Sequence, residues 1–396
     1  MNREDFLLLK NNIIYFDNGA TTLKPKCLAQ AVSEYYNEYS ANAHRGDYSL
    51  SLKVDAMYEN TRKLVRDFIH AKKAKEIVFT SGSTDSLNKI IFGYYAYYLK
   101  EGDHILLTRS EHASNMLPWF ELAEKKNLVI DYIELDEGYQ VTMEHVEKAI
   151  TSQTKVISIA HITNVIGDVR PIKEITQYAH QKGIDVVIDG AQSIPHIPVD
   201  VQELDVDFLV FSAHKIYGPT GVGVLYGKEK LLNNIHPIIF GGGMNTSFSS
   251  DGIRIYNELP YMLEAGTPNI AGVIGFGKVI EYLMGNIEQI HNHEMILKQY
   301  LLKKLKEIDN IKIYNEKSES GIVALNYDGI FAQDLAIYLN KYDICVRAGN
   351  HCAKALKEEI NVKNTVRISL GLYNTKEEID RLIEVLKNPH IKEEII

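Results

Sequence analysis

The stretch DFLVFSAHKIYGPTGVGVLYG, residues 207–227, decides the fold class. It begins with an almost wholly apolar run, continues through Lys215 into a loop rich in glycine and proline, and ends in a second apolar run. Short apolar runs bounded in this way are typical of β-strands. A lysine at the edge of a sheet is partly desolvated, which lowers its pKa and frees the amine as a nucleophile. Because buried lysines are rare, Lys215 is a candidate catalytic residue.

Five further apolar runs precede this stretch, and longer amphipathic segments separate them. They are EIVFT (76–80), HILLT (104–108), LVIDYIEL (128–135), KVISIAHI (155–162) and DVVIDGA (185–191). Strands that alternate with helices pair in parallel through helical crossovers. The sequence therefore predicts an α/β fold with a mostly parallel, doubly wound sheet.

The pattern changes near residue 283, where a long amphipathic helix is followed by short strands and further helices. We expect a large domain over residues 18–282 and a smaller α+β domain formed by residues 1–17 and 283–396. No repeat or low-complexity linker interrupts the chain, so the two domains are expected to pack against each other.

Composition excludes several classes of protein. The net charge of −9 argues against a nucleic-acid partner, because neutralising phosphates requires a basic face. The apolar runs are too short to cross a membrane, and the first residues lack the features of a signal peptide. The three cysteines, Cys27, Cys345 and Cys352, are odd in number and give neither a disulfide framework nor a CxxC metal pair. We expect a cytoplasmic protein with reduced thiols, no membrane partner and no metal.

Ligands of open parallel sheets bind at the carboxyl ends of the strands, so polar residues just after apolar runs are candidates for a site. Ser81, Gly82, Ser83 and Thr84 lie between an apolar run and a predicted helix. Hydroxyls and backbone N–H groups at a helix start bind phosphate, although for this stretch taken alone a simple helix cap is the more common reason for serine and threonine. Neither P-loop spacing nor a strand-following GxGxxG is present, so a bound phosphate would not belong to a dinucleotide.

Asp189 ends a second apolar run, and Gln192 follows one turn later. A carboxylate at this place can pair with a cationic ring nitrogen or a metal, or can cap the next turn. A phosphate site, a strand-end carboxylate and the Lys215 amine together supply what pyridoxal 5'-phosphate requires: an anion site, a pyridinium partner and a Schiff-base amine.

Six longer motifs also resemble a known family. They are SGSTDSLN (81–88), TRSEHASNMLPW (108–119), DGAQS (189–193), SAHKIYGPTGVGVLYG (212–227), EAGTPN (264–269) and RAGNHCA (347–353). They are similar to the motifs of class V pyridoxal-phosphate enzymes, in particular the SufS-type cysteine desulfurases, over residues 15–374. The resemblance implies the fold of type I aminotransferases and the conversion of L-cysteine to L-alanine. It also implies a homodimer that passes sulfur to an acceptor protein of the SufE or SufU/IscU kind, for iron–sulfur clusters or another acceptor pathway.

The resemblance implies a role for each site residue. Lys215 would bond the cofactor, Asp189 would hold its ring nitrogen, and Gln192 would contact its phenolic oxygen. His112 would stack on the ring and relay protons. Arg367 would clamp the substrate carboxylate, a task that suits a planar bidentate donor. The remaining predicted contacts to cofactor or substrate are those of Ser83, Thr84, Asn164, Ser212, His214 and Arg347, with Thr267 reaching in from a second subunit.

Cys352 lies in a loop between a strand-like run and a helix-like one. Gly349 would give this loop freedom, and the helix start together with His351 would stabilise a thiolate. By the resemblance, Cys352 carries sulfur as a persulfide. We expect Cys345 to be a buried structural cysteine and Cys27 to be incidental.

One residue departs from the family pattern, and two other functions stay open. Tyr48 stands where many relatives carry a second histidine, while the compact Cys352 loop and the stretch GGGMNTSFSSDG (241–252) are similar to the SufS branch. Selenocysteine lyase or another class V activity is the alternative enzyme. A metal module would use His351 and Cys352 with residues 291–293, although the four-ligand spacing of a zinc site is missing.

Overall fold

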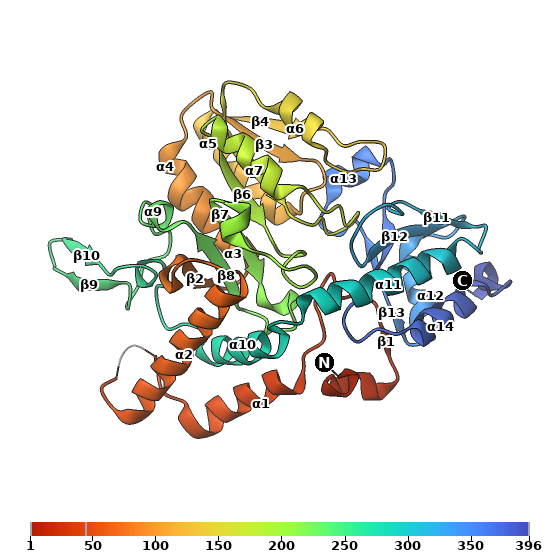
Figure 1. The fold of residues 1–396 in the computed structure, drawn as a ribbon, viewed down its shortest axis with the longest axis horizontal. Helices are drawn as coiled ribbons and strands as arrows, with labels where there is room; N and C mark the ends of the chain where they lie inside the picture. Colours follow the sequence, from red (N-terminus) through yellow and green to blue (C-terminus); the bar gives the residue numbers. More distant parts are fainter. Residues whose placement is uncertain (1, 44–45, 395–396) are drawn as a thin grey trace.

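The computed structural model describes residues 2–43 and 46–394, and its largest sheet has seven strands (Figure 1). In order across the sheet these are β2 (Ile77–Thr80), β8 (Gly223–Gly227), β7 (Phe208–Ser212), β6 (Asp185–Asp189), β5 (Thr154–Ala160), β3 (His104–Thr108) and β4 (Val129–Ile133). Each apolar run named above forms one of these strands. The predicted α/β class is confirmed.

The strands from β7 to β4 pair in parallel, whereas β8 pairs antiparallel with both β7 and β2. The reason is the connection between β7 and β8: residues 213–222 are too few for a crossover helix, so the chain turns straight back. Because β2 and β7 are both antiparallel to β8, they run in the same direction. The carboxyl end of β2 therefore lies at the same edge as those of β3, β5, β6 and β7.

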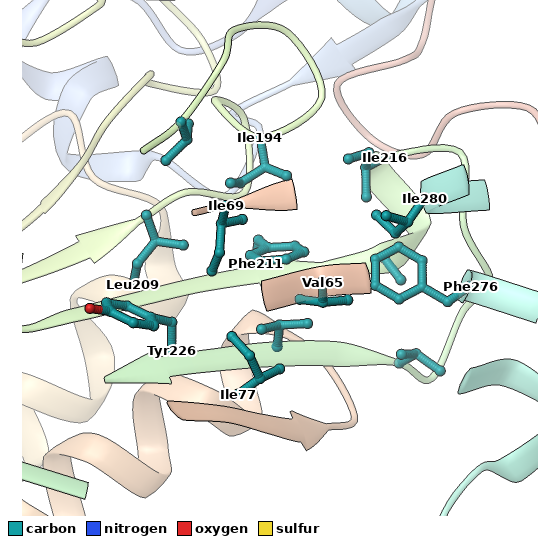
Figure 2. Close-up of a cluster of buried hydrophobic side chains, with 14 of the residues drawn as sticks. Val65, Ile69, Ile77, Ile194, Leu209, Phe211, Ile216, Tyr226, Phe276 and Ile280 are labelled. Carbon is teal, nitrogen blue, oxygen red and sulfur yellow. The ribbon is translucent and has the colours of Figure 1, made fainter. Parts of the chain in front are cut away.

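Helices cover both faces of this sheet. In β6, Val186 and Ile188 pack into one core and Val187 into the other, as the alternation of side chains along a strand requires. Figure 2 shows part of the first core, which includes Phe211 of β7, Val65 of α2 and Phe276 of α10; the ring centroids of the two phenylalanines are 6.5 Å apart. The helices of this part of the chain are α1 (Lys26–Glu34), α2 (Ser49–Phe68), α3 (Ser83–Ile90), α4 (Ala96–Tyr98), α5 (Leu117–Lys126), α6 (Met143–Ala149), α7 (Ile172–Gln181), α8 (Val201–Leu204), α9 (Glu229–Leu232) and α10 (Ile270–Leu283).

A second, antiparallel sheet lies in the C-terminal part of the chain (Figure 1). Its strands, in order, are β11 (Ile311–Ile313), β12 (Ile322–Tyr327), β15 (Thr365–Ser369) and β14 (Arg347–Gly349). The accompanying helices are α11 (Ile287–Leu305), α12 (Ala332–Asn340), α13 (Lys354–Glu359), α14 (Lys376–Leu386) and α15 (Ile391–Glu394). Near the N-terminus β1 (Ile14–Tyr15) pairs in parallel with β13 (Ile344–Cys345). A strand near the N-terminus therefore pairs with a strand of the C-terminal part. The exact domain boundaries stay a prediction.

Two features lie outside these sheets. The hairpin of β9 (Asn245–Phe248) and β10 (Arg254–Tyr256) projects from the body of the molecule (Figure 1). Helices α10 and α11 meet at a bend of 73°. In the described ranges no single helix has the length and hydropathy of a membrane span. Only α10 and α11 taken together, despite the bend between them, have that length and hydropathy.

Candidate active site

A cavity of about 510 Å³ lies where the parallel strands end, between the large sheet and strands β14 and β15. Such a volume suits a cofactor with a small substrate. Eleven of the predicted site residues line it: Ser83, Thr84, His112, Asn164, Asp189, Ser212, His214, Lys215, Arg347, Cys352 and Arg367. The topology thus brings together residues that lie as far apart in the chain as Ser83 and Arg367.

Lys215 and Asp189 form the centre of the cavity. Burial lowers the pKa of the Lys215 amine, while the nearby Asp189 carboxylate opposes this shift. Within the described part of the chain the amine makes no hydrogen bond or ion pair. Burial raises the pKa of Asp189, and the Lys215 amine opposes that shift. Its Oδ1 accepts a hydrogen bond from Ala191 N at 3.0 Å, which leaves Oδ2 to face a ligand. The amine can therefore react, and the carboxylate can still pair with a cation.

The peptide that precedes Lys215 is held by an unusual number of donors. The His214 carbonyl accepts from Thr22 N at 3.1 Å, from the hydroxyls of Thr21 and Thr22 at 3.0 and 3.2 Å, and from Lys24 Nζ at 2.7 Å. Burial lowers the pKa of Lys24 to about 7. These contacts fix the backbone from which Lys215 extends, and sequence reasoning missed Thr21, Thr22 and Lys24 because no local pattern marks them.

Hydroxyl groups gather at the start of α3. Ser212 Oγ accepts from Ser83 N at 2.8 Å and lies 2.9 Å from Ser83 Oγ, while the hydroxyls of Thr84 and Ser114 are 2.8 Å apart. His214 also lines the cavity, and burial, followed by the charge of Lys215, lowers its pKa to about 4. Neutral donors at a helix N-terminus suit a phosphate group.

His112 is neutral at physiological pH. Burial lowers its pKa to about 4, and the charges of Lys215 and Arg367 add to the shift. Its Nδ1 accepts a hydrogen bond from Ser114 N at 3.1 Å, so the single ring proton lies on Nε2. An uncharged ring with one N–H group can stack on a flat cofactor and donate a hydrogen bond from Nε2.

A fully buried ion pair involves Glu111, the residue before His112, and no local sequence pattern predicts it. Glu111 pairs with Arg170, and both side chains are completely excluded from solvent. Glu111 Oε2 also accepts from Ala160 N at 2.8 Å and from Asn115 Nδ2 at 2.9 Å. Because these contacts join the ends of β3 and β5, they fix the place of His112 relative to the sheet.

The Cys352 loop is held against the large sheet by its own backbone. The carbonyl of His351 accepts from Asn164 Nδ2 and that of Cys352 accepts from Ala113 N, both at 2.7 Å. His351 and Cys352 have φ values of +55° and +56°, a conformation that few residues other than glycine adopt. The thiol itself is exposed. The loop thus presents Cys352 to the cavity in a strained conformation.

Two expectations about the neighbours of Cys352 are wrong. His351 does not add positive charge: burial, with the charges of Arg367 and Lys357, lowers its pKa to about 2, and its Nε2 contacts Thr365 O at 3.0 Å. The ring is turned toward β15, a direction that the sequence does not encode locally. Cys345 is only partly buried rather than a core residue, because it lies on the short edge strand β13; Cys27 is partly buried as well.

Arg367 and Asn164 offer open polar atoms. Arg367 is 2% exposed; its Nη1 donates to Asn164 O at 2.9 Å, and its Nε has no partner among the described residues. Asn164 Oδ1 is also without a partner in this part of the structure. A Cβ at Gly19 would lie 3.0 Å from Arg367 Cζ, so glycine is needed for the guanidinium to pack there. A buried donor and acceptor without partners fit a polar substrate.

Two predicted residues do not line this cavity. Gln192 is buried beneath it, with Nε2 donating to Gly19 O at 2.8 Å and Oε1 lacking a partner in the described structure. Thr267 is exposed on a separate part of the surface. Their cofactor contacts, and the role of Thr267 in a second subunit, stay predictions. Sequence reasoning in turn missed several lining residues: Gly19, Ala20, Ser114, Gln333, Asn350 and Asn364.

The model of a protein family described as class-V aminotransferases matches residues 14–382. The chain belongs to this family. A probable cysteine desulfurase of Halalkalibacterium halodurans is 41% identical over 95% of this chain and 92% of its own. Among solved structures, an apo cysteine desulfurase of Thermococcus onnurineus has a TM-score of 0.93, 38% identity, and coverage of 97% of this chain and 96% of its own. The structure of the Escherichia coli cysteine desulfurase CsdA has a TM-score of 0.93 and 33% identity, and the match covers 100% of this chain and 98% of its own.

These matches confirm the family and fold that the motifs indicated. For the alternative metal module, we find no group of three His, Cys, Asp or Glu side chains arranged to hold an ion in residues 2–43 and 46–394. His293 instead contacts Asn374 O at 3.0 Å. Tyr48, at the place of the family's second histidine, is exposed just before α2.

Proposed function

We propose that the chain is a pyridoxal-phosphate-dependent cysteine desulfurase, which converts L-cysteine to L-alanine and keeps the sulfur as a persulfide on Cys352. One observation carries this proposal: a single cavity holds the unpaired amine of Lys215, the carboxylate of Asp189 and the exposed thiol of Cys352. The names of relatives that are 36–41% identical over nearly the whole chain support it.

The residues present fit the cofactor. Asp189 offers a free carboxylate oxygen to a protonated ring nitrogen, and His112 offers a neutral ring to stack on. The hydroxyls of Ser83, Thr84 and Ser212 at the start of α3 would hold the phosphate, and Lys215 supplies the amine that bonds the aldehyde. When bound, the cofactor withdraws electrons from the Cα of the amino acid attached to it.

Each residue of the cavity then has a separate role in the reaction. The open Nε of Arg367 and Oδ1 of Asn164 bind the polar groups of the amino acid. Lys215 Nζ, whose pKa is lowered by burial, removes the Cα proton. Cys352 Sγ attacks the substrate sulfur: the new S–S bond forms as the Cβ–S bond breaks. Cβ takes a proton and leaves as part of alanine, so one thiol is consumed and one persulfide appears.

The finer assignment follows the SufS branch. We propose a homodimer, in which Thr267 of one protomer contacts the phosphate of its partner, and a dedicated sulfur-acceptor protein that serves iron–sulfur clusters or a related pathway. The exposed position of Thr267 on this chain is compatible with the homodimer. The short connection between β14 and α13, which carries Cys352, is compatible with the acceptor protein. The cytoplasmic location expected from composition stays a prediction.

The proposed function is tested by incubating the purified holoenzyme with L-cysteine and a thiol reductant. We expect alanine and sulfide in equal amounts, measured by amino-acid analysis and by sulfide assay. L-Selenocysteine is supplied in parallel. Turnover of selenocysteine without any turnover of cysteine would make the protein a selenocysteine lyase instead.

Asp189→Asn is expected to keep the shape of the cavity while slowing turnover by about 2–4 kcal/mol of activation free energy, the usual cost of losing one preorganised charge contact. The reason is that an amide cannot hold the ring nitrogen in its protonated form. Stopped-flow kinetics under single-turnover conditions measures the effect, with the exposed Asp309→Asn as a control. An unchanged rate in Asp189→Asn would show that this carboxylate has no part in the chemistry.

A further inference from the structure

The register of β14 and β15 places two arginines directly opposite each other. Arg347 and Arg367 are Cα partners in this antiparallel pair. Like charges at such positions destabilise a sheet unless an opposite charge lies between them. Both side chains line the cavity, Arg367 buried and Arg347 with 49% of its side chain exposed. The fold therefore needs an anion at this point.

Asp17, in the N-terminal segment, supplies that anion. Arg347 Nε donates to Asp17 Oδ1 and Oδ2 at 3.1 and 3.0 Å, and Arg347 Nη2 donates to Oδ2 at 2.8 Å. Arg367 makes a single, longer contact, from Nη2 to Asp17 Oδ1 at 3.3 Å. Asp17 itself is 8% exposed and is fixed by a bridge to Ser369 at the end of β15.

The two guanidinium groups differ in how many hydrogen bonds they donate to Asp17. The forked edge of Arg347 is already occupied by a carboxylate, which is the ligand that this edge binds best. Arg367 Nε has no partner among the described residues, and Arg367 Nη1 donates to the backbone oxygen of Asn164, whose own side-chain oxygen also lacks a partner there. Two cations share one anion, so one positive charge remains uncompensated in a largely buried place. A second carboxylate would complete the set, and Arg367 has the open donor for it.

We propose that Asp17 is a positioning residue that assigns the carboxylate of the amino-acid substrate to Arg367 by occupying Arg347. This inference rests on the proposed function, because it takes the ligand to be an α-amino acid. Asp17 does not touch the reacting atoms. It acts by keeping the second guanidinium off the substrate, so that the carboxylate has one place to bind and Cα one position relative to Lys215.

A double-mutant cycle tests this assignment. L-Alanine, the carboxylate-bearing product, is titrated by calorimetry into holoenzyme of the wild type, Asp17→Asn, Arg347→Gln and the double variant. We expect Asp17→Asn to bind L-alanine about tenfold more tightly than the wild type, because Arg347 is released to share the carboxylate. This factor is at the low end of the coupling measured for close charge pairs. Arg347→Gln should bind about tenfold more weakly, because Asp17 then competes for Arg367. The double variant should return to within about threefold of the wild type.

The order of affinities separates the alternatives. A double variant as weak as Arg347→Gln would mean that Arg347 itself binds the carboxylate. Weaker binding by a folded Asp17→Asn would mean that Asp17 only supports the structure. Arg347 is half exposed, so its glutamine variant keeps the fold, and wild-type affinity in that variant would by itself overturn the proposal. Asp309→Asn, which changes an exposed aspartate elsewhere, should leave the affinity unchanged.

Acetate provides the check that does not depend on the proposed function. Acetate shares only the carboxylate with an amino-acid substrate. The binding of 13C-labelled acetate to the four proteins is measured from line broadening in NMR spectra. If acetate follows the expected order while wild type binds no L-alanine, the role of Asp17 stands and the amino-acid substrate is wrong. If wild type binds L-alanine and neither ligand follows the order, the role of Asp17 is wrong.

Discussion

Replacing Cys352 with serine is expected to lower alanine release from L-cysteine by about 10³-fold or more, the scale of loss when a nucleophile is removed. A hydroxyl cannot take up sulfur as a persulfide, so the chemistry stops at that step. The loop itself should stay in place, because Asn164 and Ala113 hold it through the carbonyls of residues 351 and 352 and not through the thiol. Cofactor content, measured from the visible absorption, should therefore match that of the wild type.

Mass spectrometry locates the sulfur in the same experiment. After brief exposure of wild type to L-cysteine, one added sulfur is expected on the peptide that holds Cys352, whose thiol is exposed. Cys345→Ser serves as the matched control and should keep full activity, because its side chain does not line the cavity. Added sulfur on Cys27 or Cys345, or full turnover by Cys352→Ser, would show that Cys352 does not carry the persulfide.

Lys215→Ala is expected to lower turnover by about 10⁴-fold or more, because the same amine both bonds the cofactor and moves the Cα proton. The neighbouring amine with a lowered pKa, that of Lys24, cannot replace it. Lys24 Nζ is held at 2.7 Å from the His214 carbonyl and does not line the cavity. Turnover is measured as alanine release under saturating L-cysteine.

Reduction with borohydride identifies the bonding amine directly. In wild type the reduced cofactor should remain attached to the tryptic peptide that contains Lys215, and in Lys215→Ala no peptide should carry it. Attachment to a peptide with Lys24 or any other lysine would show that the amine has been misassigned.

Much of the fold could be predicted because its signals are local. Each strand of the large sheet is a short apolar run, and Asp189 and Lys215 follow such runs directly. The antiparallel direction of β8 was less evident, since it depends on the length of the connection after β7 rather than on the strand's own residues.

The supporting contacts of the site could not be predicted, because they join residues far apart in the chain. Asp17 and Arg347 are 330 positions apart, and Glu111 meets Arg170 across two strands. No periodicity or spacing links such pairs. The error at His351 has the same origin: its ring is turned toward Thr365, which lies 14 positions further along the chain on β15.

The cross-strand pairing of Arg347 with Arg367 sets a limit on how this enzyme's gene can vary in length. Successive side chains of a strand point to opposite faces, so one inserted codon between Ile344 and Arg347 would turn that arginine away from Asp17. Insertions just after α13 (Lys354–Glu359), in the residues that lead to β15, leave both this pairing and the Cys352 loop untouched. Homologous genes should therefore gain and lose codons in the second segment and keep a constant length in the first.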